Sequence, residues 1–525
     1  MKSSGNNFFK YIFILVVIAL IAGAIYIVYD KNKPNEENDE EVENATQNNN
    51  VSIVENLKMG ITNYDTMNPI LTKNREIVNI DKLVFDSLIN ITSDYKAEYS
   101  LATACTKVSD TQYEIKVNTG IKWQDGSSLI AKDVQYTINK IQETGSIYMQ
   151  NIQKIVSVDT PDSETVIINL SEAVPYFEYN LTFPIISSTY YLNEDFQSTG
   201  KIPIGTGMYK IASIDNDNIL LIRNDRWRNV KSNPPKTQSI TIHKYNAIGE
   251  IFNAFKLGNI DVVNTYMTDY TNYVGTMGYN KKEYAGRDYD FISMNCKDSI
   301  LSDSAVRKAL NYGINKENIV STVFGNSKIV ADTPLDYGSY LNNAEGKISY
   351  NQEEAKKTLE NGGWTYVSGR WQKNIGGYVR KLTLSLVVNK NNNDRVRVAN
   401  NIKSQLADIG VIINIVQVDD NKYYEYLNNK NYQIILTGVK SSVNPDMTYF
   451  YGYNNLANYQ NDDVQSKLSS LDNYNEIQKK VNEYVPYIGL YRNKGVIILN
   501  SNVGGDFSPN TFNLYYNFDR WFRQQ

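Results

Sequence analysis

An uncharged apolar run near the amino end most constrains what this chain can fold into. Residues 11–29 read YIFILVVIALIAGAIYIVY, which is 19 positions without a charged side chain. As a helix this run is about 28 Å long, close to the thickness of the hydrocarbon core of a bilayer. We therefore predict a transmembrane anchor at residues 11–29 after a short tail at residues 1–10. Two alternatives stay open: a signal peptide cleaved near Ala22-Gly23-Ala24, and a helix buried in a large core.

Residues 30–50 are expected to form an acidic, disordered tether. Six of the eight residues from Glu36 to Glu43 are acidic, and a polar stretch follows as far as Asn50. Such a segment buries too little apolar surface to fold, and its charges repel one another. With a short tail on the inner side, the prediction is a single-pass protein of the cell membrane whose body lies on the extracytoplasmic side.

The composition excludes several classes of function. The 525 residues include two cysteines, Cys105 and Cys296, and one histidine, His243, too few for a disulfide framework or a histidine-rich metal site. The net charge of −4 gives no reason to expect nucleic-acid binding. No nucleotide-binding, zinc-protease or CxxC motif is present, and His243 is predicted on the polar side of a half-buried strand. We expect no enzyme, no cofactor and no metal, although two carboxylates could still meet in space as in a glycosidase.

Alternating periods predict a mixed α/β body from Val51 to the carboxyl end. Predicted strands are Leu57–Ile61, Tyr113–Val117, Thr165–Leu170, Ile219–Arg223 and Ser239–Tyr245. Predicted helices are Ala131–Ile141, Ser304–Gly313, Asn315–Phe324, Gln352–Asn361, Arg395–Ile409 and Glu476–Val485. We interpret Gly205-Thr206-Gly207 as a turn that needs positive φ, and both cysteines as buried thiols.

Motifs in order along nearly the whole body resemble one known family. They are Lys58-Met59-Gly60, Met67-Asn68-Pro69, a helix over Ile80–Ile89 that ends in Asp86-Ser87-Leu88, Tyr113–Val117, and residues 120–126 (GIKWQDG), 131–134 (AKDV), 203–209 (PIGTGMY), 223–227 (RNDRW), 257–262 (LGNIDV) and 306–310 (VRKAL). On these segments the chain resembles the extracytoplasmic solute-binding proteins of ABC importers, family 5, which include the oligopeptide- and dipeptide-binding proteins.

The resemblance implies a fold of the α/β class, a periplasmic-binding-protein-like (type II) clamp of two lobes with an extra inserted domain. Lobe I would comprise residues 51–89, 205–290 and 494–525. The inserted domain II would comprise residues 90–204, and lobe III residues 291–493. The crossings near residues 290 and 493 would then form the hinge that closes around a ligand. A monomer is expected.

The resemblance also implies a function and a binding site. The protein would capture a peptide or peptide-like solute and deliver it to the permease subunits of an ABC importer, which work with their ATPase. In this family a peptide is held as an extra strand. The segments that match its main-chain contacts are Thr62-Asn63-Tyr64 and Gly438-Val439-Lys440-Ser441.

The chain departs from the family pattern at this site. Peptide binders of the family carry an aspartate for the ligand's ammonium four residues before the proline that matches Pro445, and this chain has Ser441 there, beside Lys440. Gly438 stands where the family has tryptophan. Arg395 matches a basic residue that often faces the cavity and could hold a carboxylate, or it is a surface charge at a helix start. We predict a preference for ligands that have a blocked amino terminus or a net negative charge.

One further class of function stays open beside transport. The chain could serve as a membrane-tethered receptor that senses a signalling peptide or another solute without transporting it. A nickel chelate and a sugar are the alternative ligands to a peptide.

Overall fold

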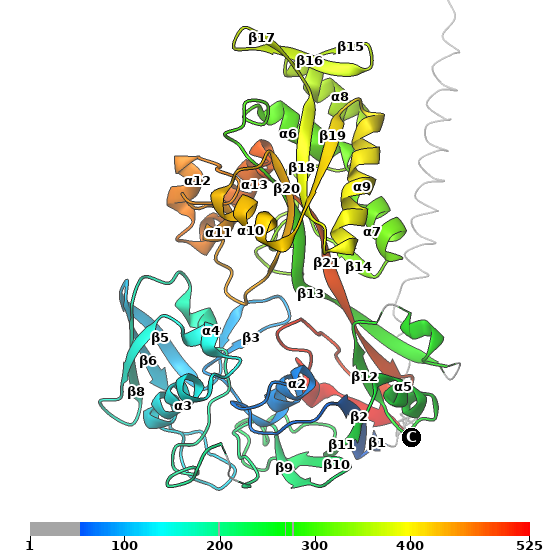
Figure 1. The fold of residues 1–525 in the computed structure, drawn as a ribbon. Coiled ribbons are helices and arrows are strands. Elements are labelled where there is room, and N and C mark those ends of the chain that lie inside the picture. The colour runs from blue at the N-terminus through cyan, green and yellow to red at the C-terminus, as the bar shows by residue number, and fades with distance from the viewer. Residues whose placement is uncertain (1–52, 198–199, 268, 276–277, 525) are drawn as a thin grey trace, which may run out of the picture. The chain divides into compact units, whose positions relative to one another are not determined.

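The computed structural model describes residues 53–197, 200–267, 269–275 and 278–524, which form a mixed α/β protein (Figure 1). The tail, the anchor and the tether predicted at residues 1–10, 11–29 and 30–50 lie outside the described residues. Among the helices of the described part, none is both long enough and apolar enough to cross a membrane.

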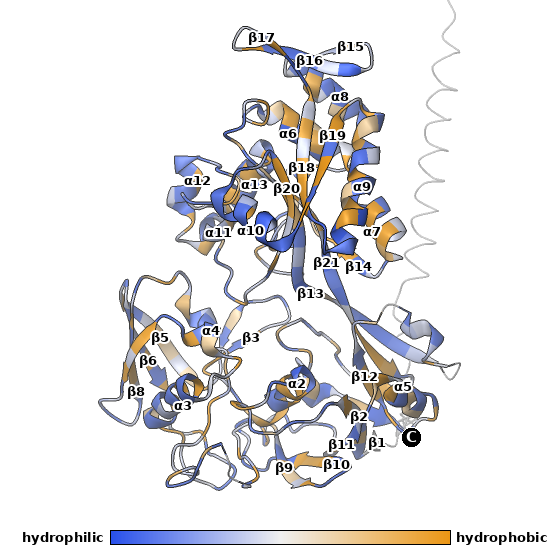
Figure 2. Ribbon diagram, in the orientation of Figure 1, coloured by the Kyte–Doolittle hydropathy of each residue, from blue (hydrophilic) through white to orange (hydrophobic). Residues whose placement is uncertain are grey.

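One large sheet organises most of the described chain, with strands in the order β19-β18-β20-β13-β21-β12-β2-β11-β10-β9. In its middle, β13 (Tyr279–Met294) and β21 (Tyr487–Asn500) pair antiparallel, with an interruption between Ala285 and Tyr289. Figure 2 shows both strands hydrophilic along the stretch where they pass from one part of the sheet to the other. We call β2 and β9 to β12 with their helices the β2 half, and β14 and β18 to β20 with theirs the β20 half.

The β2 half is built on a parallel pair of strands. Strand β2 pairs with β11 from Asn56 opposite Ser239 to Thr62 opposite Tyr245. Leu57, Met59 and Ile61 alternate into a core that helix α2 covers, as period-two strands require. The elements are β2 (Asn56–Thr62), α2 (Arg75–Val84), β9 (Tyr209–Ile214), β10 (Asn218–Arg223), β11 (Ser239–Tyr245), α5 (Ile248–Lys256) and β12 (Val262–Thr265), with a separate small sheet of β1 (Ile53–Val54), β22 (Val503–Gly504) and β23 (Phe522–Gln524).

Residues between α2 and β9 form a second sheet with its own core, which we call the four-stranded domain. Helix α3 packs on this sheet. At the start of the helix, the Asp133 carboxylate accepts hydrogen bonds from the Ile130 N–H at 3.0 Å and from the Trp123 indole N–H at 3.1 Å. The elements are β5 (Ala102–Ser109), β6 (Gln112–Val117), α3 (Ala131–Thr144), α4 (Met149–Ile152), β7 (Ile155–Asp159) and β8 (Thr165–Leu170), with the hairpin of β3 (Ile89–Ile91) and β4 (Ala97–Tyr99) beside them.

The β20 half has helices on both sides of its strands, over two hydrophobic cores. Its strands are β14 (Lys328–Val330), β18 (Thr383–Asn389), β19 (Ile412–Val418) and β20 (Ile434–Lys440), and β15 (Thr365–Val367), β16 (Arg370–Ile375) and β17 (Tyr378–Lys381) form an outlying sheet. Its helices are α6 (Ser304–Gly313), α7 (Lys316–Phe324), α8 (Gln352–Asn361), α9 (Asn393–Asp408), α10 (Asp420–Asn429), α11 (Thr448–Tyr451), α12 (Asp462–Lys467) and α13 (Tyr474–Tyr484).

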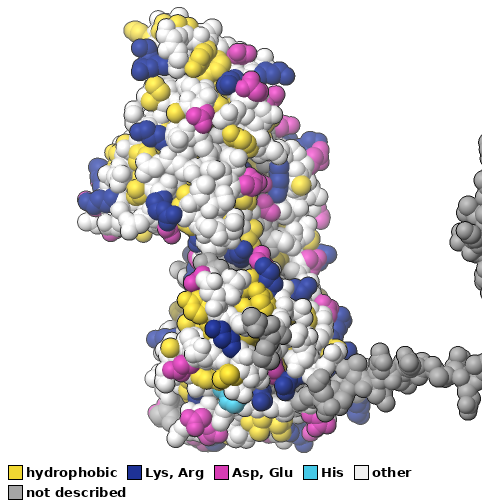
Figure 3. Space-filling model, turned by 90° about the vertical axis from the view of Figure 1, so that its right-hand side faces the viewer, with side chains coloured by type: hydrophobic (Ala, Val, Ile, Leu, Met, Phe, Trp, Pro, Cys, Tyr) yellow, Lys and Arg dark blue, Asp and Glu magenta, His cyan; other side chains and the backbone are white. Residues whose placement is uncertain are grey.

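Most of the predicted elements are confirmed. All five predicted strands and all six predicted helices occur, with ends that differ by at most three residues. His243 is half-buried on β11, on the face opposite the buried Ile240 and Ile242, as predicted. Figure 3 shows acidic and basic side chains intermingled over one face of the molecule, which agrees with the nearly balanced composition.

Three predictions were wrong in detail. The helix expected over Ile80–Ile89 ends at Val84, where Phe85 turns to an extended backbone. Gly205 and Gly207 do not have positive φ. They are required because the backbone of this turn lies against the end of α2, and a side chain at Gly205 would overlap the Val84 carbonyl oxygen. Cys105 and Cys296 are only half-buried, although burial raises the pKa of Cys105 to about 12.

Candidate functional site

Strand β20 has an open edge at its carboxyl end. It pairs with β13 along its whole length but with β18 only at Ile434 and Ile435. The Ser441 N–H donates to the Arg287 carbonyl at 2.8 Å, so by alternation Gly438 and Lys440 direct their main-chain groups away from β13. Among the described strands, none pairs with these groups. This edge can therefore accept an extended ligand as an additional strand.

Gly438 is required by an ion pair that crosses the strand. Its opposite residue on β13 is Asp290, whose carboxylate accepts from Arg395 Nε at 2.6 Å. The Arg395 guanidinium lies over Gly438 so closely that a Cβ there would overlap Nη2. A larger side chain, such as the tryptophan that the resemblance implies here, could not occupy this position without moving the ion pair. Within the described chain no hydrogen bond is formed by the Arg395 Nη groups, so one edge of the guanidinium stays available to a ligand.

Replacing Arg395 with methionine should lower the unfolding free energy by about 3–5 kcal/mol near neutral pH, because the buried Asp290 carboxylate would lose its partner. Burial raises the pKa of Asp290 and Arg395 opposes that rise, so the substitution raises the pKa further. Below about pH 4 the carboxyl is protonated in the folded and the unfolded chain alike. The destabilisation should therefore shrink as pH falls from 7 toward 4.

Urea unfolding at a series of pH values measures this effect. The double variant Asp290→Asn with Arg395→Met is the control, since it removes both charges and should recover much of the loss. A loss that stays the same at every pH would contradict the ion-pair explanation and would assign Arg395 to packing alone.

Ser441 lies between two arginine side chains. Arg492 Nη1 donates to the Ser441 hydroxyl oxygen at 2.8 Å, and Arg287 Nε donates to the Ser441 carbonyl at 2.8 Å. Within the described chain, neither arginine forms an ion pair with a carboxylate. An additional cation, Arg75 at the start of α2, contributes to lowering the pKa of Arg287, after the larger effect of burial.

Arg492 is fully buried on β21, so its charge needs more compensation from its surroundings than the charge of the half-buried Arg287. The Arg492 guanidinium lies 4.7 Å and 4.8 Å from the ring centroids of Tyr289 and Tyr337, and Nη2 donates to the Pro334 carbonyl. Its Nε has no hydrogen-bond partner among the described residues. Aromatic faces and carbonyls stabilise a buried cation only in part, and a nearby anion would stabilise it further.

The other predicted segment, Thr62-Asn63-Tyr64, follows β2 and is held by the start of α2. The Thr62 N–H donates to the Glu76 carboxylate at 2.6 Å, and the Asn74 amide donates to the Thr62 and Asn63 carbonyls at 2.7 Å each. The ring of Tyr64 lies 3.9 Å from the Lys244 ammonium. The main chain of Thr62 is thus already hydrogen-bonded to residues at the start of α2, which leaves the side chains of this segment available to a ligand.

The structure brings some predicted site residues together and not others. Arg395 meets Gly438, Val439 packs half-buried against the β20-half core, and Lys440 is exposed. In the described chain no hydrogen bond or ion pair joins the segment Thr62-Asn63-Tyr64 to the end of β20. Nor does that part of the chain contain a cluster of three His, Cys, Asp or Glu side chains that could hold a metal. Sequence reasoning missed Arg287 and Arg492, because neither lies in a motif.

Comparisons with known proteins agree with this architecture. The sequence model described as bacterial extracellular solute-binding proteins, family 5 (middle), matches residues 96–461. Oligopeptide-binding protein AppA of Bacillus subtilis (strain 168) is 23% identical over 484 residues, which are 84% of this chain and 87% of AppA. The nickel-binding periplasmic protein of Escherichia coli (strain K12) is 22% identical over 382 residues, 69% of this chain and 71% of that protein.

A solved structure shows the same fold. The nickel ABC transporter structure from Bacillus halodurans superposes with a TM-score of 0.74 at 18% identity, over 89% of this chain and 100% of that chain. The likeness confirms an α/β, two-lobe, periplasmic-binding-protein-like fold.

Proposed function

Because this chain belongs to the bacterial extracellular solute-binding proteins of family 5, we propose that it captures a peptide or peptide-like solute that carries a negative group and delivers it to the permease of an ABC importer. The family places the chain among the solute-binding proteins of ABC importers, and the relatives it matches are binding proteins rather than enzymes. Those relatives are named for oligopeptides and nickel.

The proposed clamp consists of lobe I (51–89, 205–290 and 494–525), domain II (90–204) and lobe III (291–493). The interruption of the β13–β21 pairing between Ala285 and Tyr289 supports a hinge there, since ladder hydrogen bonds do not stiffen this stretch. The ligand would lie along the open edge of β20 at Gly438 and Lys440, with Val439, Ser441 and Arg395 beside it. The segment Thr62-Asn63-Tyr64 would close on it from lobe I.

The observation that carries the ligand assignment is the pair of arginines at Ser441. Arg287 and Arg492 both donate to this residue, and in the described chain neither forms an ion pair with an acid, although Asp288 acts on Arg287 and Asp336 on Arg492 at longer range. An ammonium placed here would meet two cations at low dielectric, whereas a carboxylate or a blocked amino terminus would not. A ligand anion beside Ser441 would also offset the cost of the buried Arg492 charge.

Calorimetry on a matched pair of peptides, one with a free amino terminus and one acetylated, tests the proposal on the body from residue 52 onward. The acetylated peptide should bind at least about tenfold more tightly, a difference of roughly 1.4 kcal/mol. Tighter binding of the free amine would contradict the proposal and would mean that an acid elsewhere receives the ammonium.

We place the body outside the cell on the proposed anchor at residues 11–29 and tether at residues 30–50. The support is the uncharged run and the acidic stretch that follows it. Protease treatment of intact cells should release a soluble fragment that begins within residues 30–55. Mature protein found free in the medium and beginning near Ile25 would contradict the anchor in favour of a cleaved signal peptide.

A further inference from the structure

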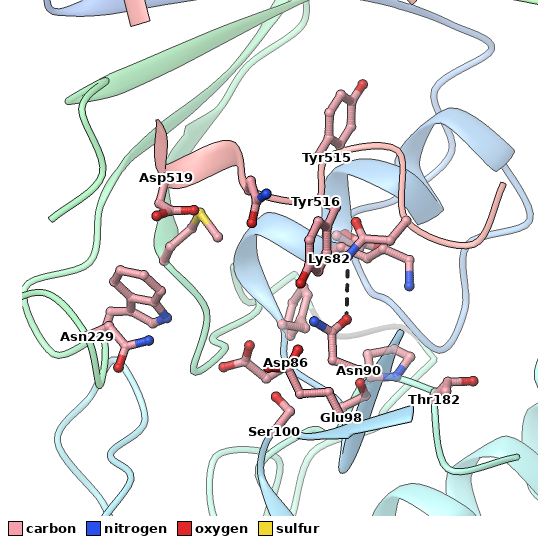
Figure 4. A pocket seen from close by; sticks show the side chains of 18 of the residues that line it. Lys82, Asp86, Asn90, Glu98, Ser100, Thr182, Asn229, Tyr515, Tyr516 and Asp519 are labelled. Carbon is pink, nitrogen blue, oxygen red and sulfur yellow. Dashed lines mark hydrogen bonds between the residues drawn. The ribbon is translucent and has the colours of Figure 1, made fainter. Parts of the chain in front are cut away.

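A cavity separate from the β20 edge lies where α2, the four-stranded domain and the carboxyl-terminal segment meet. Its volume is about 420 Å³, and its walls come from α2, the β3–β4 hairpin with its flanking loops, and residues 513–520. In the view of Figure 4, Lys82 and Tyr516 lie above Asn90, and Glu98 and Ser100 lie below it. A cavity of this size holds a small organic molecule of amino-acid to dipeptide dimensions.

One wall residue, Asp81, is a buried acid without a partner. Only 2% of its surface is exposed, and among the residues that the structure describes neither carboxylate oxygen has a hydrogen-bond partner. Burial raises the pKa of Asp81 well above its usual range, with Asp65 adding to the rise and Lys82 opposing it. The phenols of Tyr64, Tyr148 and Tyr191 also lie within its electrostatic influence. Native proteins rarely leave a buried carboxyl unsatisfied without a functional reason.

The neighbouring wall residue, Lys82, is a cation without a partner. In the described chain its ammonium forms no hydrogen bond and no ion pair within 4 Å. Burial lowers the pKa of Lys82 to about 8, with Asp81 opposing, so the side chain is still mostly charged at pH 7. Asp81 and Lys82 therefore offer one acidic and one basic group to the same cavity.

Asp86 and Arg520 of the wall are already paired inside the protein, whereas Glu98, for which the described chain shows no ion pair, is exposed to solvent, unlike the buried Asp81. Asp86 accepts from Arg228 at 2.7 Å and from the Thr206 hydroxyl at 2.9 Å, and Arg520 pairs with Asp506 at 2.9 Å. The aromatic residues Phe85, Tyr148, Trp227 and Tyr515 complete the walls. Aromatic faces suit the apolar part of a ligand and attract its ammonium group.

We propose that this cavity is a second binding site, which takes a small zwitterion of the α-amino-acid class. Asp81 receives the ligand's ammonium, and Lys82 receives its carboxylate. Each group of the ligand thereby supplies the partner that one wall residue lacks, and the opposite charges of the ligand suit the adjacent acidic and basic groups on α2. The site is independent of the proposed peptide site, since none of the residues assigned to that site lines the cavity.

Thermal-shift measurements on residues 52–525 with each proteinogenic amino acid at millimolar concentration test the proposal. At least one amino acid should raise the melting temperature, while its N-acetyl and its amide derivatives should not. The variants Asp81→Asn and Lys82→Met should each weaken its binding at least tenfold by calorimetry. Lys73→Met, which removes an exposed lysine just before α2, and Ser441→Asp, at the peptide site, should leave the affinity unchanged.

A second readout separates a ligand contact from a merely structural role. Because the ammonium partner lowers the pKa of Asp81, binding should release a proton, which calorimetry in buffers of different ionisation enthalpy detects. Asp81→Asn should abolish this release, because a carboxamide has no proton to give up at this pH. The proposal is overturned if no amino acid shifts the melting temperature, or if Ser441→Asp abolishes the shift while Asp81→Asn and Lys82→Met preserve it.

Discussion

Exchanging Ser441 for aspartate should reverse the charge preference of the peptide site. The new carboxylate would stand within reach of Arg492 Nη1, which donates to the Ser441 hydroxyl at 2.8 Å, and would neutralise the buried cation. Relative to the unmodified protein, free-amine peptides should gain on their acetylated counterparts by about 2–5 kcal/mol, or roughly 30-fold to several thousandfold in Kd. Calorimetry on the matched peptide pair measures the change.

Ser442→Asp is the matched control, because it adds the same charge one residue away at an exposed position. Its carboxylate would remain in water, where screening reduces its effect to a small fraction of that figure. Equal and small effects of the two substitutions would mean that Ser441 is not beside the ligand's terminus. That outcome would refute the alignment of Ser441 with the family's aspartate.

Exchanging Gly205 for alanine should destabilise the protein by about 3 kcal/mol or more. The new Cβ would overlap the Val84 carbonyl oxygen, which is backbone and cannot rotate away as a flexible side chain would. The turn would have to move from the end of α2, and the hydrogen bond from the Gly207 N–H to Val84, now 2.8 Å long, would be lost. The midpoint of urea unfolding should fall accordingly.

Gly249→Ala is the control for this substitution. Gly249 is an exposed residue of α5, and a Cβ there meets no atom within 4 Å. Alanine favours a helix over glycine by about 0.5–1 kcal/mol, so this variant should be as stable as the unmodified protein or slightly more so. An unchanged unfolding midpoint for Gly205→Ala would show that the turn and α2 can separate without cost.

Local patterns in the sequence determined many of the elements. The predicted helices Ser304–Gly313 and Gln352–Asn361 have the observed bounds, and Asn315 caps α7 by accepting from the Asn318 N–H at 2.8 Å. These features depend on residues a few positions apart, whose contacts the helical or extended backbone itself dictates. The family, too, followed from ordered local motifs, and the match over residues 96–461 confirms it.

The sequences of β13 and β21, the two strands that join the halves of the sheet, show no such local pattern. Strand β13 reads YNKKEYAGRDYDFISM, without alternation, because it is paired on one or both sides except at Gly286 and Arg287 and changes its surroundings midway. The role of Gly205 was misassigned for a related reason. The requirement comes from α2, more than a hundred residues away in sequence, and not from the local φ.

The sequence by itself determined the class of fold and the family, and it predicts a departure from the family pattern at Ser441. Only the tertiary structure placed Arg287 and Arg492 on either side of that serine, paired Arg395 with Asp290, and left Asp81 without a partner in a cavity. The reason is physical. Periodicity reports which face of an element is apolar, whereas the charge around a site is a sum over side chains that distant segments bring within a few ångströms of each other.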